Sequence, residues 1–200
     1  MSAEFQSWIA EVRARLANPA PRRMAVSPGQ EPRRASVFVP LYVEAGELWT
    51  VLTKRSAKLP QHKGQVAFPG GGLELGEDFW AAALRESEEE MGWESRTILK
   101  LGELDEVDSS TGFRLVPCVG AIPWPIDTKP NEDEIDEVFS APLRAFAQPQ
   151  AIEDRAVRID GRERLVRVYH VGRHPVWGLT ALVLRNLLER LGLPVAEPEE

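Results

Sequence analysis

The chain has 200 residues, of which 43% are hydrophobic and 28% charged, and this ordinary globular composition excludes wholesale disorder, collagen-like repeats and coiled coils. Its 24 Lys and Arg residues are outnumbered by 31 Asp and Glu residues, and the resulting formal net charge of −7 argues against a nucleic-acid partner. No apolar run approaches the length of a membrane span, so we expect no membrane partner and a small-molecule ligand instead.

Compartment and domain organisation follow from equally simple features. The single cysteine, Cys118, cannot form an internal disulfide, and residues 1–4 lack the basic and apolar segments of a signal peptide. We therefore expect a cytoplasmic protein. A chain of this length buries about 70% of its unfolded surface, so we expect one domain over residues 1–200, and the sequence leaves both a monomer and a homodimer open.

A short amphipathic helix is predicted at the start of the chain, where apolar residues recur at helical spacing and the pattern ends before Asn18 and Pro19. A Pro- and Arg-rich connection follows and, together with the helix, makes up residues 1–34. The Arg pairs at 22–23 and 33–34 could touch phosphates, although a solvated surface loop is the simpler interpretation. The apolar positions of the helix are Phe5, Trp8, Ile9, Val12 and Leu16.

Strand patterns dominate the rest of the chain. β-Branched and aromatic residues on either side of a turn at 44–47 predict a hairpin. A short strand then leads into a glycine run and a helix over 78–91 that ends at Gly92, and a last amphipathic helix spans 179–191 with Leu182 among its apolar positions. Many short strands with two or three helices predict an α/β (α+β) domain in which a mixed sheet is covered on both faces. The strands are predicted at 36–43, 48–54, 65–68, 100–104, 114–122, 137–141, 157–159 and 165–171.

The helix over 78–91 has an unusual charge pattern. At about 100° per residue, one face carries Trp80, Leu84, Ser87 and Met91, and the nearly opposite face carries three glutamates. Like charges three or four residues apart repel one another in a helix, whereas a divalent cation such as Mg²⁺ would bind several carboxylates together. A solvated acidic face is the alternative, but a glycine-rich turn leads directly into the helix and favours a metal. The glutamates are Glu86, Glu89 and Glu90.

The glycine run itself permits close contact with a ligand. Gly70, Gly71 and Gly72 would allow backbone N–H and C=O groups to approach a bound molecule without side-chain obstruction. A simple turn is the alternative. Glu77 and Asp78 suit the first turn of the following helix by charge.

The residues of this segment resemble a known signature. Gly71 is followed after five residues by Glu77, then after seven by Arg85-Glu86-Ser87, and after single residues by Glu89-Glu90 and Gly92-Trp93. Residues 71–93 thus resemble the 23-residue Nudix box. The departure is Ser87, where an aliphatic residue is usual. The resemblance implies the Nudix α/β/α sandwich and hydrolysis of a nucleoside diphosphate linked to another moiety.

The same resemblance implies roles for the matching residues. Glu86 and Glu90 are the expected principal ligands of Mg²⁺ or Mn²⁺, and Glu89 is a further ligand or the general base. The Gly71 carbonyl is another expected metal contact, and Arg85 would hold the glutamates in position by charge-assisted hydrogen bonds. The expected catalytic residues are therefore Glu89, Arg85 and Glu86.

A second motif lies before the box. The sequence LTKRS at 52–56 and, seven residues later, GQVAFPGG at 64–71 resemble the extra motif of the coenzyme A pyrophosphatase subfamily, with a looser match at 177–180. The implied reaction cleaves coenzyme A or its thioesters into 3′,5′-ADP and 4′-phosphopantetheine or its acylated form. Pro60 stands where many members carry an arginine, so phosphate binding there would either be weaker or come from Lys58, His62 or Lys63. The substrate-binding residues expected from this motif are Arg55, Lys63, Gln65 and Gly70; Lys58 is more simply a surface charge, and His62 is ambiguous.

Two alternatives to this activity stay open. The chain could be a Nudix hydrolase of ADP-ribose, NADH or a nucleoside triphosphate, which the departure at Pro60 allows. It could also be a non-catalytic Nudix ligand sensor, although its glutamates are intact and 200 residues leave no space for an independent DNA-binding domain.

Other polar residues give weaker indications. Cys118 is expected to be a buried structural thiol. Asp105, Glu106 and Asp108 could form an extra metal or base site, but a solvated loop is equally consistent with the pattern. Some Nudix enzymes carry an additional glutamate in a position like the acidic run 131–137, yet we do not expect Glu134 or Glu137 to belong to the site.

Overall fold

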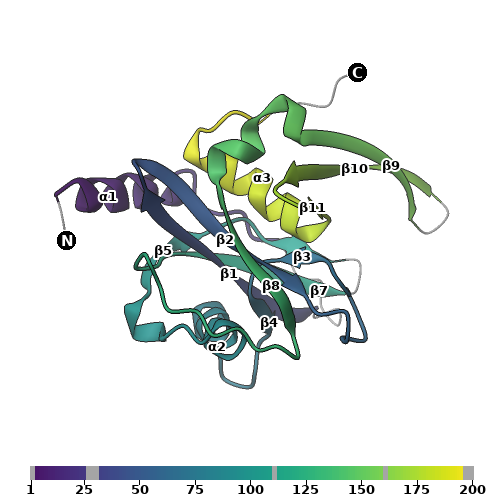
Figure 1. The fold of residues 1–200 in the computed structure, drawn as a ribbon, viewed down its shortest axis with the longest axis horizontal. Coiled ribbons are helices and arrows are strands. Elements are labelled where there is room, and N and C mark those ends of the chain that lie inside the picture. The colour runs from purple at the N-terminus through teal and green to yellow at the C-terminus, as the bar shows by residue number, and fades with distance from the viewer. Residues whose placement is uncertain (1–2, 26–31, 110–111, 160–161, 196–200) are drawn as a thin grey trace.

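The computed structural model describes residues 3–25, 32–109, 112–159 and 162–195 (Figure 1). Each predicted helix and strand is found at or near its expected position. Strands β4, β6 and β11 and the three 3₁₀ helices of the described residues were not predicted. The sequence also predicts that Asp160-Gly161 joins the strands at 157–159 and 165–171, and these two residues lie outside the described residues. The elements are α1 Ala3–Ala17, β1 Arg33–Glu44, β2 Glu47–Arg55, β3 Val66–Ala67, β4 Gly70–Gly72, α2 Phe79–Met91, η1 Ser95–Thr97, β5 Leu99–Glu103, β6 Val107–Asp108, β7 Phe113–Ala121, β8 Ile135–Pro142, η2 Leu143–Ala147, η3 Pro149–Ala151, β9 Ile152–Ile159, β10 Arg162–Val171, β11 His174–Trp177 and α3 Leu179–Leu191.

The main sheet is mixed, as expected. Its central path runs β3-β2-β1-β7-β5, with β4 paired to β1, β6 to β7 and β8 to β2. Strand β1 pairs antiparallel with β2 and β4 but parallel with β7. Strand β3 pairs with β2, and the glycine strand β4, which comes next in the chain, pairs with β1. The glycine run is therefore held against a central strand of the sheet.

Helices cover both faces of this sheet, which confirms the predicted layered α+β fold (Figure 1). Alternate residues of β1 point to opposite faces: Phe38 and Tyr42 join the core beneath α2, whereas Val39 and Leu41 join the core beneath α1 and α3. Helix α1 contributes Ile9, Val12 and Leu16 to the core that it shares with α3. Among the described residues, no helix is both long and apolar enough to cross a membrane.

A second, three-stranded sheet was not foreseen from the strand pattern. It has the order β11-β10-β9, is not hydrogen-bonded to the main sheet and lies beside α3 (Figure 1). Strand β11 also contacts β3 and leads through Gly178 into α3. The end of the chain therefore returns to the edge where the 64–71 motif lies.

Two sequence expectations about the surface need correction. Leu182 was placed on the apolar face of the last helix, but it is 50% exposed because Val183, Leu184, Leu187 and Leu188 already form the buried stripe. The 19–34 connection is not a purely solvated loop, since the Nε atom of Arg22 lies 2.9 Å from an Asp105 oxygen. Residues 26–31 of that connection lie outside the described residues.

Candidate functional site

The glycine run and helix α2 are fixed to each other by close contacts. A Cβ atom on Gly70 would overlap the Ser36 carbonyl and Val37, and a Cβ atom on Gly71 would overlap the Glu86 carboxylate. The glycines are therefore required by contact and do not form only a simple turn. Helix α2 begins at its N-cap Asp78, whose Oδ1 accepts a 2.7 Å hydrogen bond from the Ala81 N–H.

The predicted acidic face opposite the core is wrong for Glu90, which lies on the buried side of α2. The buried stripe consists of Ala82, Ala83, Ser87, Glu90 and Met91, and Glu90 is near its centre with only 3% of its surface exposed. Trp80 and Leu84 are only partly buried. Ala83 is fully buried in the core beneath α2, whereas Trp80 packs against that core from its border.

The burial of Glu90 is only partly compensated by other groups. Burial raises the pKa of Glu90 to about 8, although Arg55 and a hydrogen bond from the Gly70 backbone act in the opposite direction. The closest approach of Arg55 to Glu90 is 3.7 Å, from Nη1 to Oε1. The Nε atom of Arg55 is buried and has no hydrogen-bond partner among the described residues. This side of α2 therefore contains a desolvated carboxylate beside an incompletely bonded guanidinium.

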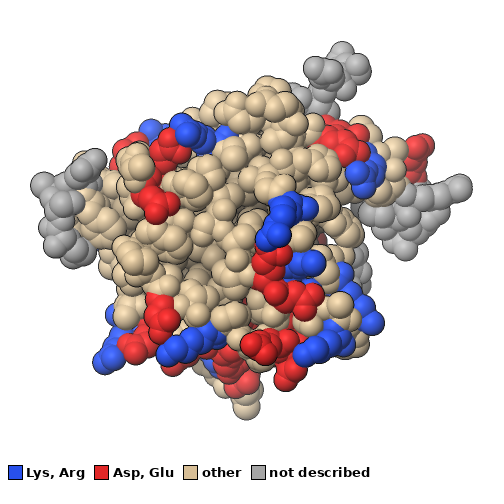
Figure 2. Space-filling view, in the orientation of Figure 1, with Lys and Arg blue, Asp and Glu red and all other residues tan. Residues whose placement is uncertain are grey.

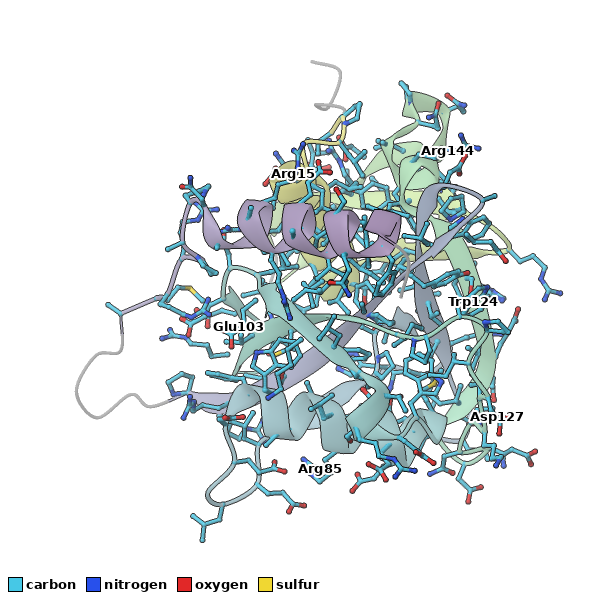
Figure 3. All side chains as sticks on the ribbon, turned by 90° about the vertical axis from the view of Figure 1, so that its left-hand side faces the viewer. Arg15, Arg85, Glu103, Trp124, Asp127 and Arg144 are labelled. Atoms are coloured by element: carbon cyan, nitrogen blue, oxygen red, sulfur yellow. The ribbon has the colours of Figure 1, made fainter. Side chains whose placement is uncertain are left out.

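Arg85 connects the other parts of the box. Its guanidinium donates to Glu77 at 2.9 Å, to Glu86 at 2.8 Å and to Glu89 at 3.1 Å. It also donates to the Gly72 carbonyl at 3.0 Å, which ties the helix to the glycine strand. The hydrogen bond from Arg85 lowers the pKa of Glu77, whereas burial raises the pKa of Glu86 despite Arg85. The positioning role expected for Arg85 agrees with these contacts, and its place on the side of the molecule away from α1 is visible in Figure 3.

The donor set fits a hard divalent cation. Among the described residues no three His, Cys, Asp or Glu side chains already converge in metal-binding geometry. However, Glu86 and Glu90 are both largely buried, and the absence of a Cβ at Gly71 leaves the Glu86 carboxylate directly against the backbone. Burial raises the pKa of each of these two carboxyls. A cation bound by carboxylate and carbonyl oxygens would stabilise their charged forms. Glu89 is more exposed, with 56% of its side chain accessible.

Glu134 lies close enough to act electrostatically on this pair, which was not expected. Its charge contributes to the raised pKa of Glu86 and of Glu90. The segment is held by a 2.9 Å hydrogen bond from the Asn131 N–H to the Glu90 carbonyl, and Asn131 also donates to Glu134 at 3.2 Å. The acidic run 131–137 was the available sequence signal. Glu137, in contrast, pairs with His174 and Arg173.

The second motif is brought to the same place by the pairing of β2 with β3. The Arg55 N–H donates to the Gln65 carbonyl at 2.9 Å, and the Gly64 N–H donates to the Arg55 carbonyl at 3.0 Å. Arg55, Gln65 and Gly70 line a cavity of about 350 Å³. His62 lines it too, with its Nδ1 atom 3.0 Å from the Gln65 side-chain oxygen.

Lys58 and Lys63, the two lysines between the parts of the second motif, are both exposed. Lys63 is exposed and is not among the residues that line the cavity. Lys58 is also exposed and lies 3.3 Å from Asp133, in agreement with a surface charge. Figure 2 shows mixed acidic and basic side chains along the lower border of the visible face, where α2 lies in Figure 1. The cationic groups of the motif are thus not equivalent, and Arg55 is the one beside Glu90.

The remaining candidates have structural roles. Cys118 is fully buried, and burial raises the pKa of its thiol to about 12, as expected for an inert structural cysteine. Asp105 is also buried and accepts hydrogen bonds from Arg22, Asn186 and Arg190. It is therefore neither a metal ligand nor part of a solvated loop, because its oxygens are occupied by these donors.

Comparison with known proteins agrees with the geometry. The model of the NUDIX domain family matches residues 32–160. Proteins described as uncharacterized Nudix hydrolase NudL from Salmonella paratyphi B and Salmonella newport are 36% identical to this chain over 162 residues, covering 80% of this chain and 84% of each relative. A solved MutT/nudix family protein from Enterococcus faecalis is similar in fold, with a TM-score of 0.56 and 16% identity over 96% of this chain and 70% of its own.

Proposed function

This chain belongs to the Nudix family, and from that premise we propose that it is a metal-dependent pyrophosphatase of coenzyme A or its thioesters. Membership makes it a Nudix hydrolase, an enzyme that hydrolyses a nucleoside diphosphate derivative. The products of the proposed coenzyme A pyrophosphatase reaction are 3′,5′-ADP and 4′-phosphopantetheine, and the 4′-phosphopantetheine is acylated when a thioester is cleaved. Residues 1–200 are proposed to act as one catalytic domain, since α1 shares its core with β1 and α3. We propose that this domain acts in the cytoplasm.

The proposed substrate rests on the position of Arg55. Arg55, from the motif that resembles the coenzyme A subfamily, lies 3.7 Å from Glu90 of the Nudix box and lines the adjoining cavity with Gln65 and Gly70. Its buried Nε atom has no partner among the described residues. An unsatisfied buried donor is costly, and a phosphate oxygen is a strong acceptor for a guanidinium. These properties suit Arg55 for binding the diphosphate beside the acidic residues.

The roles proposed for the box follow from the contacts around α2. Glu86, Glu90 and Glu89, with the Gly71 carbonyl, would hold Mg²⁺ or Mn²⁺. When bound, such an ion neutralises charge on the diphosphate and lowers the pKa of the attacking water. Glu89 is the most exposed of the three glutamates and is proposed to accept the proton from that water. Arg85 positions Glu86 and Glu89 through its 2.8 and 3.1 Å hydrogen bonds.

Glu134 is a second candidate for the base. It comes from the segment before β8, and its charge acts on both Glu86 and Glu90. A carboxylate opposite α2 could accept a proton from a water that attacks between the two elements. Comparing Glu89→Gln with Glu134→Gln separates the candidates, because the true base controls kcat at saturating substrate and metal.

The proposed activity is tested by product analysis. Purified protein is incubated with coenzyme A, ADP-ribose, NADH and a panel of nucleoside triphosphates, each with Mg²⁺, with Mn²⁺ and with a chelator. Metal-dependent release of 3′,5′-ADP, in clear preference to the other reactions, is the expected result. Preference for another diphosphate would retain the Nudix chemistry and reject the coenzyme A assignment, whereas no hydrolysis of any substrate would favour a ligand sensor.

A further inference from the structure

The cavity beside Arg55 extends well beyond the space needed for a diphosphate. It measures about 350 Å³ and lies between β3, β7 and the N-terminal end of α3. Apolar groups dominate its lining, and Trp177, at 45% exposure, places part of that lining at the surface. Its apolar lining includes Val37, Ala67, Leu115, Trp177 and Val183.

The cavity is continuous with the proposed reaction centre. Arg55 and Gly70 line it, and the same two residues contact Glu90, Arg55 through Nη1 at 3.7 Å and Gly70 through a backbone hydrogen bond. One end of the cavity is therefore beside the carboxylates. A ligand whose diphosphate lies at Glu90 can extend one of its two halves past Arg55 into this space.

Charge and size decide which half enters. Among the described residues that line the cavity, only Arg55 and His62 can carry a charge, and Arg55 lies at the end beside Glu90. Thr180 contributes a hydroxyl that donates to the Val66 carbonyl at 2.9 Å, and Gln65 contributes an amide. Binding pockets for small molecules are typically about 300 to 1,000 Å³, and a cavity of about 350 Å³ is near the lower end of that range. A ligand as large as coenzyme A, with a nucleotide, a diphosphate and a long arm, would therefore place only part of itself inside.

We propose that this cavity binds the pantetheine arm of the substrate, with the thiol or thioester end directed toward Trp177 and α3. The arm is uncharged and combines apolar carbons with two amides, which matches an apolar lining with a few polar groups. The nucleotide half, with its additional 3′-phosphate, would be left outside the cavity. This inference rests on the proposed coenzyme A activity and adds the binding site that would recognise the non-nucleotide half.

Equilibrium binding measured by calorimetry in the presence of a chelator tests the site without turnover. In the wild-type protein, coenzyme A should bind at least about tenfold more tightly than 3′-phosphoadenosine 5′-diphosphate, because the two ligands share the nucleotide and the diphosphate and only coenzyme A buries the arm. Val183→Phe, which fills the cavity from α3, should remove this difference and leave the affinity for 3′-phosphoadenosine 5′-diphosphate within about twofold. Leu182→Phe is the matched control on the adjacent, exposed residue and should change neither value.

A second variant covers the possibility that a larger side chain at the buried position 183 prevents folding. Ala67→Phe fills the cavity from β3, where the native residue is partly exposed, and should have the same effect on binding. Equal affinities of the wild-type protein for coenzyme A and 3′-phosphoadenosine 5′-diphosphate would overturn the assignment, as would an arm contribution retained in every folded filled-cavity variant. A parallel turnover assay with metal separates the two proposals, because failure of the wild-type protein to hydrolyse coenzyme A would reject the proposed function itself.

Discussion

Arg55 and Glu90 face each other from different elements, strand β2 and helix α2, with 3.7 Å between Nη1 and Oε1. The two residues are 35 positions apart in the chain, and their pairing joins the two sequence motifs. The distance exceeds that of a normal hydrogen bond, so each side chain retains capacity for another partner. A substrate phosphate and a cation are partners of the required charges.

Arg55→Ala should therefore impair catalysis more than stability. We expect kcat/KM for coenzyme A to fall by about 10- to 100-fold, because a charge-assisted contact to the diphosphate is lost. Lys58→Ala is the matched control in the same segment, since Lys58 is exposed and contacts Asp133 and the Glu132 carbonyl. It should stay within about twofold of wild type. Equal losses in the two variants would show that only the general positive charge of the segment matters.

Gly71→Ala tests the contact between the glycine strand and Glu86. The new methyl group would overlap the carboxylate, so Glu86 must move, and we expect about 10- to 100-fold weaker Mg²⁺ activation. The adjacent Gly72→Ala is a strict control, because a Cβ there meets nothing closer than 3.9 Å. Titrating Mn²⁺ binding by electron paramagnetic resonance measures the effect directly. Unchanged Mn²⁺ affinity in Gly71→Ala would contradict the proposed ligand arrangement.

Glu86→Gln should abolish turnover while sparing the fold. The amide retains the size of the side chain but lacks the negative charge needed for a divalent cation, so we expect kcat to fall by about 10²-fold or more. Glu88→Gln on the exposed side of the same helix should have little effect. Activity is measured by release of 3′,5′-ADP, and thermal unfolding checks the fold. Near-wild-type activity of Glu86→Gln would refute the metal-site assignment.

The sequence predicts α2 well because local signals agree there. Asp78 and Gly92 mark its ends, and both cap geometries are found in the structure, including the left-handed backbone of Gly92. The face that packs against the sheet was harder to predict. Tryptophan and leucine outrank glutamate by hydrophobicity, yet Glu90 is buried and Trp80 is only partly so. A functional carboxylate in the buried stripe breaks the local rule, and only the packing against β1 and β4 reveals it.

Long-range contacts account for the remaining differences. The acidic run 131–137 marks Glu134 as a candidate but does not by itself place it near Glu86, because that proximity depends on the Asn131 backbone bonding to the end of α2. Asp105 likewise has the sequence context of an acidic loop, and its partners come from positions 22, 186 and 190. These contacts arise between segments far apart in sequence, which periodicity and spacing do not encode.

The Asp105 network provides the final prediction, on stability. Burial alone would raise the pKa of Asp105, but hydrogen bonds from the Arg22 backbone and from the Arg190 and Arg22 side chains outweigh it and lower the pKa overall. Its stabilising contribution is therefore present above the unfolded pKa of about 3.9 and is lost as the pH falls through the lower folded value. Asp105→Asn should cost about 3 kcal/mol at pH 7, because it leaves the buried Arg190 without its charge partner.

Urea denaturation at neutral and acidic pH checks this, and the cost should shrink as the wild-type carboxylate becomes protonated. Asp108→Asn is the matched control, since its side chain is 55% exposed beside Arg114, and its cost should be below about 1 kcal/mol. Metal-dependent turnover measured on folded Asp105→Asn should be retained, because the network links the 19–25 segment to α3 on the far side of the sheet from α2. A small stability loss with abolished turnover would instead place Asp105 in the catalytic machinery.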